Sequence, residues 1–303
     1  MLESTLKMQE TPSSPSPFRN NRIILYSGLI LTIFIIVFIV LFMLMQMRQM
    51  TDARTALNTE NMAKLMEQSY DGLIDTIDVA LLSSADEISR QLAAGTANRQ
   101  AITQYLARQT SRLPNVAFIR ASNERGDIIY GRDILFPYVN IADREHFIQL
   151  RDHPNTGLFI SKPLLIRIDN KWAWLFARRI NKPNGEFAGV VNALIFVDEL
   201  DKLLAKITLH TGDVAALRDG EIGVIARHVF NGSNPAPPGD KKIAQPFVEA
   251  LQKNPNLGTY ISGGTSIDAI SRTQSYRRSA KYGYYVNVGI SRDAALEVWR
   301  QQA

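Results

Sequence analysis

One uninterrupted apolar segment constrains this chain more than any other feature. Residues 23–45 carry no charged side chain. As an α-helix, about 23 residues would measure about 35 Å, which is enough to cross a hydrocarbon core of about 30 Å. A cleaved signal peptide would have a shorter apolar region and a small-residue cleavage site, whereas this segment continues into Met47 and Arg48. We therefore predict an uncleaved transmembrane helix over residues 23–47.

The two sides of this span differ in what can fold there. Basic residues are nearly balanced across the span, so the positive-inside rule does not decide its orientation. Residues 1–22 are rich in Pro and Ser, which predicts a disordered tail. The sequence that can form a core follows the span. We therefore expect a cytoplasmic tail, a single span in a bacterial inner membrane, and a periplasmic chain beyond about residue 48.

The composition argues against several classes of function. The net charge is +5, but the basic residues are interspersed with acidic ones, so no nucleic-acid partner is predicted. The chain has no cysteine, and its four histidines lack metal-ligand spacing. It also lacks the G-x-S-x-G, P-loop and H-E-x-x-H patterns and a strand-linked G-x-G-x-x-G. We therefore expect no enzyme activity, metal or cofactor in these residues.

A long helix is predicted directly after the span, in residues 48–95. Apolar residues recur from Met62 to Leu92 at a spacing close to that of a helix. No proline interrupts the segment, and Gly95 is a predicted stop. The apolar stripe could contact the chain's own sheet, or its first turns could pair with a second copy. We expect a homodimer through this stalk helix.

In the rest of the sequence, a similar series of helices and strands is predicted two times. In the first cycle, the clearest signals are a hairpin turn at residues 123–126 and Asn140 as the N-cap of a helix that ends at Leu150. The other elements of this cycle are predicted at residues 101–112 (helix), 116–120, 127–130, 157–161, 164–168, 172–180 and 187–196 (strands), and 197–207 (helix).

The second cycle is shorter. Its elements are predicted at residues 214–217 and 222–226 (strands), 243–252 (helix), 258–262, 273–278 and 282–290 (strands), with a last helix from residue 294. Antiparallel sheets with helices on one face give an α+β class. We expect two lobes, residues 96–207 and 208–290, and we expect residues 291–303 to begin a helix that leads to a second span.

Residues 140–200 resemble the membrane-distal lobe of double Cache (PAS-like) sensor domains, most like those that precede GGDEF diguanylate cyclases and some histidine kinases in proteobacteria. Residues 275–291 resemble the closing strands of the membrane-proximal lobe. The likeness covers about residues 50–300. The segments that carry it are Asp143-Arg144-x-x-Phe147, residues 157–163, the strand from Trp172 to Asn181, and Gly185-x-Phe187-x-Gly189-Val190-Val191.

The resemblance implies two tandem PAS-like (Cache) lobes on the stalk helix and a small-molecule sensing function. In such receptors a second span and a cytoplasmic output domain follow, and residues 1–303 contain no cyclase signature. We therefore expect the input portion of a transmembrane receptor, whose longer parent protein would carry a diguanylate cyclase or histidine kinase. The alternative is a membrane-anchored interaction or dimerisation module without a small ligand.

The resemblance also implies that Arg144 and Phe147 lie in a ligand pocket, on a short helix. In amino-acid-binding relatives this helix carries Arg-x-Trp-Tyr, and the arginine binds the ligand carboxylate through a planar set of donors. Here His146 and Phe147 replace the two aromatic residues. Those relatives also hold the α-amino group with an Asp, but the matching strand has no acid before Asp198.

The strand around Trp172 supplies the remaining candidates. Trp172, Trp174, Phe176 and Arg178 alternate along it, so their side chains share one face. Such a face would suit a small organic solute, in particular an anion. The alternative is that the aromatic residues are core and that Arg178 forms a local salt bridge. His146 and His153 are expected on the surface. The candidate ligand-binding residues are therefore Arg144, Phe147, Trp172, Trp174, Phe176 and Arg178.

Overall fold

The computed structural model describes residues 17–167, 170–208, 210–232, 236–263, 269–295 and 297, and for residues 17–24 the backbone alone. The chain divides into two compact units after Asp52. Helix α1 (Pro17–Ala93) contributes residues to both units. The two units are described separately below.

The first unit contains the apolar part of α1. From Leu25 to Met45 almost every side chain is exposed, for example Phe34 and Phe38 at 68% and 63%. By length and composition, this is the one helix in the described part of the chain that could cross a membrane. The predicted long apolar N-terminal helix is confirmed, and the membrane span over residues 23–47 stays a prediction. The helix begins earlier than predicted, at Pro17, and residues 1–16 of the predicted tail lie outside the described residues.

The second unit begins with the remaining turns of α1, which end where the sequence predicts. Gly95 has φ +61°, a conformation that costs glycine little. Its N–H donates to the Leu92 carbonyl at 3.2 Å, and the Thr96 N–H donates to the Gln91 carbonyl at 3.1 Å. This pair of bonds is the Schellman motif, which satisfies the last carbonyls of a helix. The predicted helix stop at Gly95 is therefore confirmed.

The distal lobe follows α1. Its six-stranded sheet has the order β2-β1-β6-β5-β3, with β4 also paired to β5, and the strand pairs are antiparallel. The strands are β1 (Phe118–Ser122), β2 (Ile128–Tyr130), β3 (Phe159–Ile160), β4 (Leu164–Leu165), β5 (Trp172–Asn181) and β6 (Phe187–Phe196). The helices are α2 (Arg99–Ser111), α3 (Glu145–Asp152) and α4 (Val197–Ala205).

The proximal lobe repeats this plan with fewer elements. Its five-stranded antiparallel sheet has the order β8-β7-β11-β10-β9. The elements are β7 (Val214–Arg218), β8 (Val224–Val229), α5 (Gln245–Lys253), β9 (Leu257–Ser262), β10 (Arg272–Arg278) and β11 (Tyr285–Ser291). The predicted α+β class, with a long helix and two antiparallel lobes, is confirmed.

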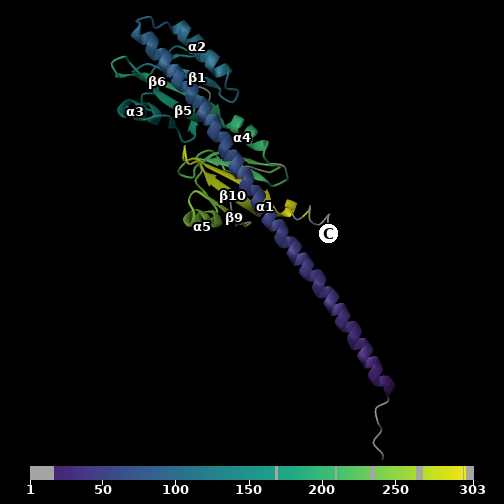
Figure 1. Cartoon of the computed structure of the whole chain (residues 1–303). Helices are drawn as coiled ribbons and strands as arrows, with labels where there is room; N and C mark the ends of the chain where they lie inside the picture. The colour runs from purple at the N-terminus through teal and green to yellow at the C-terminus, as the bar shows by residue number, and fades with distance from the viewer. Residues whose placement is uncertain are drawn as a thin grey trace, which may run out of the picture. The chain divides into compact units, whose positions relative to one another are not determined.

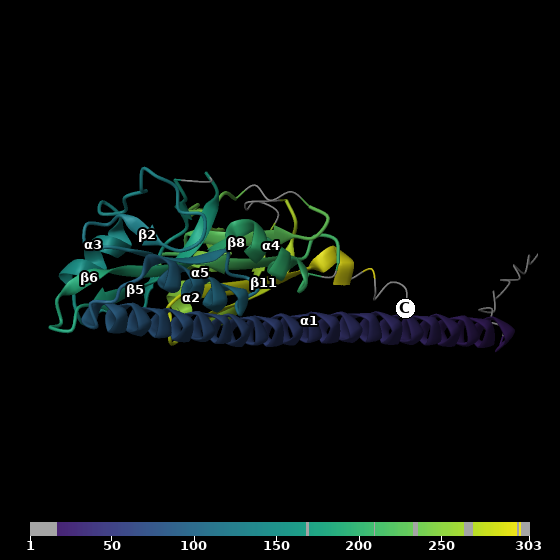
Figure 2. The ribbon, with the colours of Figure 1, turned by 90° about the horizontal axis from the view of Figure 1, so that it is seen from above.

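Both sheets turn one face toward α1 (Figures 1 and 2). A single buried cluster joins residues of α1, such as Ile77, to Trp174 and Phe176 of the distal sheet and to Val286 and Val288 of the proximal sheet. Much of the apolar stripe of the stalk is therefore used within the chain. Burying this stripe removes apolar surface from water and fixes both lobes to one helix.

Two local predictions differ from the structure, and a third lies largely outside the described residues. Helix α3 begins at Glu145, and Asn140 does not cap it. Instead, the Asn140 side chain accepts from the Ala142 N–H at 2.9 Å and donates to Asp127 at 2.8 Å, which ties this segment to the β1–β2 turn. Strands β3 and β4 are shorter than predicted and flank Pro163, which has no N–H to donate to a ladder. The predicted last helix lies largely outside the described residues.

Candidate ligand-binding site

A cavity of about 50 Å³ lies in the distal lobe, on the face of the sheet opposite α1. Strands β1, β2, β5 and β6 form its floor, and the segments before α3 and around β4 complete its walls. Its lining is mostly aliphatic, with a small polar group that includes three arginines. The lining residues are Phe118, Arg120, Ile128, Val139, Ile141, Arg144, His146, Leu164, Ile166, Arg167, Leu175, Asn192 and Leu194.

Strand alternation decides which side chains reach the cavity. Successive residues of a strand point to opposite faces, so Leu175 lines the cavity while its neighbours Trp174 and Phe176 contact the α1 cluster. Strands β1 and β6 place Arg120 directly opposite Asn192. Both side chains are buried, with exposed fractions of 6% and 4%. The register thus puts a buried cation and a buried amide side by side in the cavity floor.

The cavity lining is positively charged. The guanidinium of Arg120 lies 3.8 Å from the centre of the Phe118 ring. Arg144 is half-buried and donates to the Leu165 carbonyl at 3.3 Å, and Arg167 is paired with Asp143 at the rim. No Asp or Glu is present among the described residues that line the cavity. A carboxylate ligand would therefore meet donors and positive charge, because guanidinium groups bind carboxylates with paired hydrogen bonds.

His146 is a buried polar group of this cavity, which makes the predicted surface position of this residue wrong. Its exposed fraction is 4%, and its Nε2 has no hydrogen-bond partner in the described part of the chain. Burial lowers the pKa of His146 to about 4, and the charge of Arg144 acts in the same direction. The imidazole is therefore neutral at pH 7, and one ring nitrogen is left to contact a ligand. His153 is exposed, as predicted.

The six predicted ligand-binding residues lie in different places. Arg144 lines the cavity. Phe147 is buried beside it, with its ring centre 5.2 Å from that of Phe187. Trp172 is 39% exposed at the start of β5. Trp174 and Phe176 are fully buried against α1, with the Trp174 Nε1 donating to the Ser161 carbonyl at 3.0 Å.

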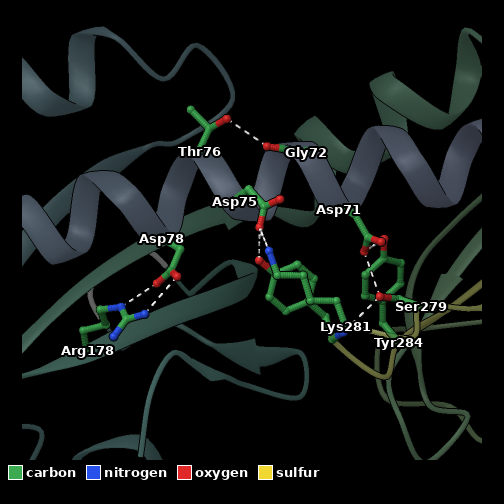
Figure 3. Close-up of polar contacts among 10 residues, drawn as sticks. Asp71, Gly72, Asp75, Thr76, Asp78, Arg178, Ser279, Lys281 and Tyr284 are labelled. Atoms are coloured by element: carbon green, nitrogen blue, oxygen red, sulfur yellow. Dashed lines mark hydrogen bonds and ion pairs between the residues drawn. The ribbon is translucent and has the colours of Figure 1, made fainter.

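The sixth predicted residue, Arg178, contacts the stalk helix. Its Nε and Nη2 lie 2.5 and 2.9 Å from the two carboxylate oxygens of Asp78 on α1 (Figure 3). This arrangement matches the core and salt-bridge alternative for the strand face. The described site instead includes Arg120, His146 and Asn192, which were not among the predicted residues. The available signal was a polar residue inside each of two mostly apolar strands, at Arg120 and Asn192.

A row of acidic residues on α1 continues this contact toward the proximal lobe (Figure 3). Asp75 accepts from Lys281 and Tyr282, and these two hydrogen bonds lower the pKa of its carboxyl. Asp71 accepts from the Ser279 and Tyr284 hydroxyls at 2.7 and 2.8 Å. Both lobes are therefore joined to α1 by polar contacts as well as by the apolar cluster.

Two PAS-like lobes on one long helix define the double Cache fold. Neither the comparison with protein-family models nor the comparison with curated proteins finds a match to this chain. Among solved structures, the extracellular domain assigned to the histidine kinase rpHK1S-Z16 is similar, with 21% identity, 80% of this chain and 97% of that chain covered, and a TM-score of 0.68.

Two further structures extend this comparison. The extracellular domain assigned to the histidine kinase soHK1S-Z6 has 15% identity, coverage of 83% of this chain and 99% of that chain, and a TM-score of 0.63. The sensory domain of the Campylobacter jejuni chemoreceptor Tlp3 with isoleucine bound has 14% identity, coverage of 82% and 96%, and a TM-score of 0.60. The chain therefore has the fold of these extracellular sensor domains, which confirms the predicted resemblance.

Proposed function

We propose that this chain is the extracytoplasmic sensing portion of a bacterial transmembrane receptor, and that its distal cavity binds a small organic anion. The observation that carries the proposal is the cavity floor, where buried Arg120 stands opposite buried Asn192 with His146 close by. Similar folds occur in extracellular domains of histidine kinases and in Tlp3, whose sensory domain was solved with isoleucine bound.

The size and lining of the cavity favour a short aliphatic carboxylate. The cavity has a volume of about 50 Å³. One water molecule occupies about 10–15 Å³ of such a volume. Four or so water-sized groups would therefore fill it, which corresponds to a ligand such as propionate. Guanidinium groups would bind its carboxylate, and the Leu175 and Leu194 side chains would contact its alkyl part. An α-amino group would find no carboxylate among the described lining residues.

The proposed route of the signal passes through β5. One face of this strand lines the cavity at Leu175, and the other is tied to α1 through Arg178 and Asp78. A ligand that shifts β5 would therefore act on the stalk helix. The ligand can bias the output only by the difference between its affinities for the shifted and unshifted positions of β5. We place the apolar segment of α1 in the bacterial inner membrane, the lobes in the periplasm, and a diguanylate cyclase or histidine kinase output in the cytoplasm.

We also propose a homodimer through the stalk. Four large apolar side chains of the second unit's helix segment remain exposed, namely Leu57, Leu65, Val79 and Leu82 at 57%, 65%, 65% and 46%. From Leu57 to Leu65 is 8 residues and from Leu65 to Val79 is 14, and both spacings are close to multiples of the seven-residue repeat of paired helices. This stripe also supports the alternative function, a membrane-anchored dimerisation module that binds no small ligand.

A thermal-shift titration separates the two functions. The full chain in lipid nanodiscs would be titrated with acetate, propionate and butyrate, and with alanine as the matched amino acid. We expect a saturable rise in the unfolding temperature with a short carboxylate. Arg144→Gln should weaken this response about tenfold or more, since a charge-assisted hydrogen bond contributes about 1.5–3 kcal/mol. Arg112→Gln, at an exposed arginine of the same lobe, is the control and should respond like the wild type.

If no carboxylate or amino acid changes the unfolding temperature, while Leu65→Glu with Val79→Glu converts a dimer to a monomer, the interaction module is the better account. If alanine stabilises the chain and propionate does not, the sensing function stands and the ligand class is wrong.

A further inference from the structure

Each of the two sheets has two edges, and three of these edges are short or covered. Strand β2 has three residues, and its Ile128 N–H donates to the Val139 carbonyl at 3.0 Å. Strands β3 and β4 have two residues each. On the edge strand β8, Val224 exchanges hydrogen bonds with Gly239 and Asp240, and α4 contacts this strand. The fourth edge is β9, which is six residues long and lies beyond β10 in the proximal sheet (Figure 1).

Alternate residues of β9 direct their backbone groups away from the sheet. Asn256, just before the strand, accepts from the Arg278 N–H at 2.7 Å and is therefore bonded to the β10 side. Successive residues of a strand direct their N–H and C=O groups to opposite sides, so the register of β9 with β10 leaves Thr259 and Ile261 facing outward. The backbone groups of these two residues have no hydrogen-bond partner in the described part of the chain. They can pair with another extended strand.

The side chains of β9 also suit an added strand. Residues 257–262 include no proline and no charged residue, although edge strands are commonly protected by such residues. Leu257 and Ile261 are 40% and 49% exposed. They share the α1 face of the sheet with Thr259, because the Thr259 hydroxyl lies 2.7 Å from that of Ser275, which lies 2.7 Å from that of Thr59 on α1. The edge therefore presents two aliphatic side chains beside its free backbone groups.

Strand β9 is held in place from its other face. Tyr260 stacks on Phe247 of α5, with ring centres 5.1 Å apart. The Tyr276 hydroxyl donates to the Ala250 carbonyl of the same helix at 2.8 Å. The Tyr276 ring lies against Gly258, where a Cβ would be 2.9 Å from the ring atom Cε1. The edge is therefore preformed, and the addition of a strand would cost little further ordering of β9.

A second copy of this chain does not fit the edge of β9 when both copies are anchored in one membrane. Two β9 strands could pair antiparallel about a twofold axis at Thr259, with Leu257 of each copy opposite Ile261 of the other. That axis is perpendicular to the sheet, so the rotation reverses directions within the sheet plane and makes the two α1 helices antiparallel. Copies whose stalk helices leave the same membrane need parallel helices. This step rests on the proposed membrane anchor, and it leaves a different protein as the occupant.

From these contacts we infer that β9 is a docking edge for an extended, uncharged segment of a partner protein. This segment would add a sixth strand to the five-stranded proximal sheet, pairing antiparallel with the backbone groups of Thr259 and Ile261. Its alternate side chains would be aliphatic, because they contact Leu257 and Ile261 at the α1 face. Such strand addition derives affinity from backbone hydrogen bonds and specificity from alternate side chains. The docking edge shares no residue with the lining of the distal cavity or with the exposed stripe of α1.

The probe is a fluorescent peptide with the sequence of residues 255–263, because in antiparallel register it places its own Leu opposite Ile261 and carries no membrane anchor. Fluorescence anisotropy with the full chain in nanodiscs should show saturable binding, and hydrogen exchange should slow at the Thr259 and Ile261 amides. Methylation of the peptide nitrogens that face β9, at its Leu, Thr and Ile positions, should weaken binding at least tenfold. Methylation of the nitrogens that face away, at its Tyr and Ser positions, is the matched control and should leave binding unchanged.

A substitution in β9 provides the reciprocal test. Ile261→Pro removes an outward N–H and leaves the β9–β10 ladder intact, since this N–H does not face β10. It should weaken peptide binding at least tenfold, whereas Ile261→Val should bind like the wild type. If Ile261→Pro unfolds at a lower temperature, the two methylated peptides provide the same comparison without a substitution.

Several results would overturn the inference. One is the absence of saturable peptide binding to the wild type, another is equal loss of binding with both methylated peptides, and a third is unchanged binding by a stably folded Ile261→Pro chain. Because the chain has no cysteine of its own, a disulfide-linked pair of Thr259→Cys chains under oxidising conditions would identify a second copy as the occupant and overturn the choice of a different protein. Failure here leaves the carboxylate response of the distal cavity unaffected.

Discussion

Replacing Trp174 tests directly whether its face of β5 belongs to the core or to a ligand site. The side chain is fully buried, its ring centre lies 4.7 Å from that of Phe176 and 5.9 Å from that of Tyr284, and its Nε1 donates to the Ser161 carbonyl. Trp174→Ala would remove this side chain and leave a cavity, at a cost of about 3–5 kcal/mol. Trp174→Phe would keep much of the apolar volume but lose the hydrogen bond, at about 1–3 kcal/mol.

The assay is thermal unfolding of the full chain in nanodiscs, with ligand binding measured on the same samples. A loss of about 4 kcal/mol corresponds to a fall in unfolding temperature of about 8–16 °C for a chain of this size. We expect that fall for Trp174→Ala, a smaller one for Trp174→Phe, and unchanged ligand affinity in Trp174→Phe. Loss of ligand binding in Trp174→Phe without loss of stability would refute the placement of this residue in the core.

Three further predictions follow from individual contacts. The pKa of His146 is about 4 in the folded chain and 6.5 for the free side chain. Between pH 4 and 6.5, the unfolded chain therefore binds one proton more than the folded chain. Stability should therefore be complete above pH 6.5 and fall by about 3 kcal/mol as the pH drops toward 4, and His146→Leu should flatten this difference in a pH series of unfolding temperatures. For the Arg178–Asp78 pair, whose side chains are 22% and 25% exposed, a double-mutant cycle with Arg178→Met and Asp78→Asn should give a coupling of about 1 kcal/mol that weakens at high salt; zero coupling would remove the pair as a link to α1. Gly189→Ala should prevent stable folding, because Gly189 has φ +146° and an added Cβ would lie 2.1 Å from the Ser122 carbonyl oxygen; normal expression and an unchanged unfolding temperature would contradict this.

The sequence pattern was informative wherever one local rule determined the outcome. The prediction of a strand at residues 187–196 matches β6, since an apolar, β-branched segment after a Pro-Asn-Gly turn leaves little choice. The helix stop at Gly95 and the two-lobe order were predictable for the same reason. The likeness to double Cache sensors added the lobe arrangement.

The site was less predictable because both faces of β5 are buried. Alternation separates Trp174 from Leu175, but it does not say which side α1 covers and which side α3 covers. The answer depends on contacts distant in sequence, such as Asp78 with Arg178, which are 100 positions apart. The same problem affects His146. The residues before it are charged, and only the start of α3 at Glu145 puts His146 on the buried face of that helix.

The direct test of the distal site is a calorimetric comparison of the wild type with Asn192→Asp, using propionate and alanine. Asn192 is buried opposite Arg120, so a carboxylate at this position would neutralise the arginine and repel an anion. Asn184→Asp in an exposed turn is the control. We expect the wild type and the control to bind propionate and not alanine. We expect the affinity of Asn192→Asp for propionate to be at least tenfold lower. Unchanged propionate binding by Asn192→Asp would contradict the proposed ligand site.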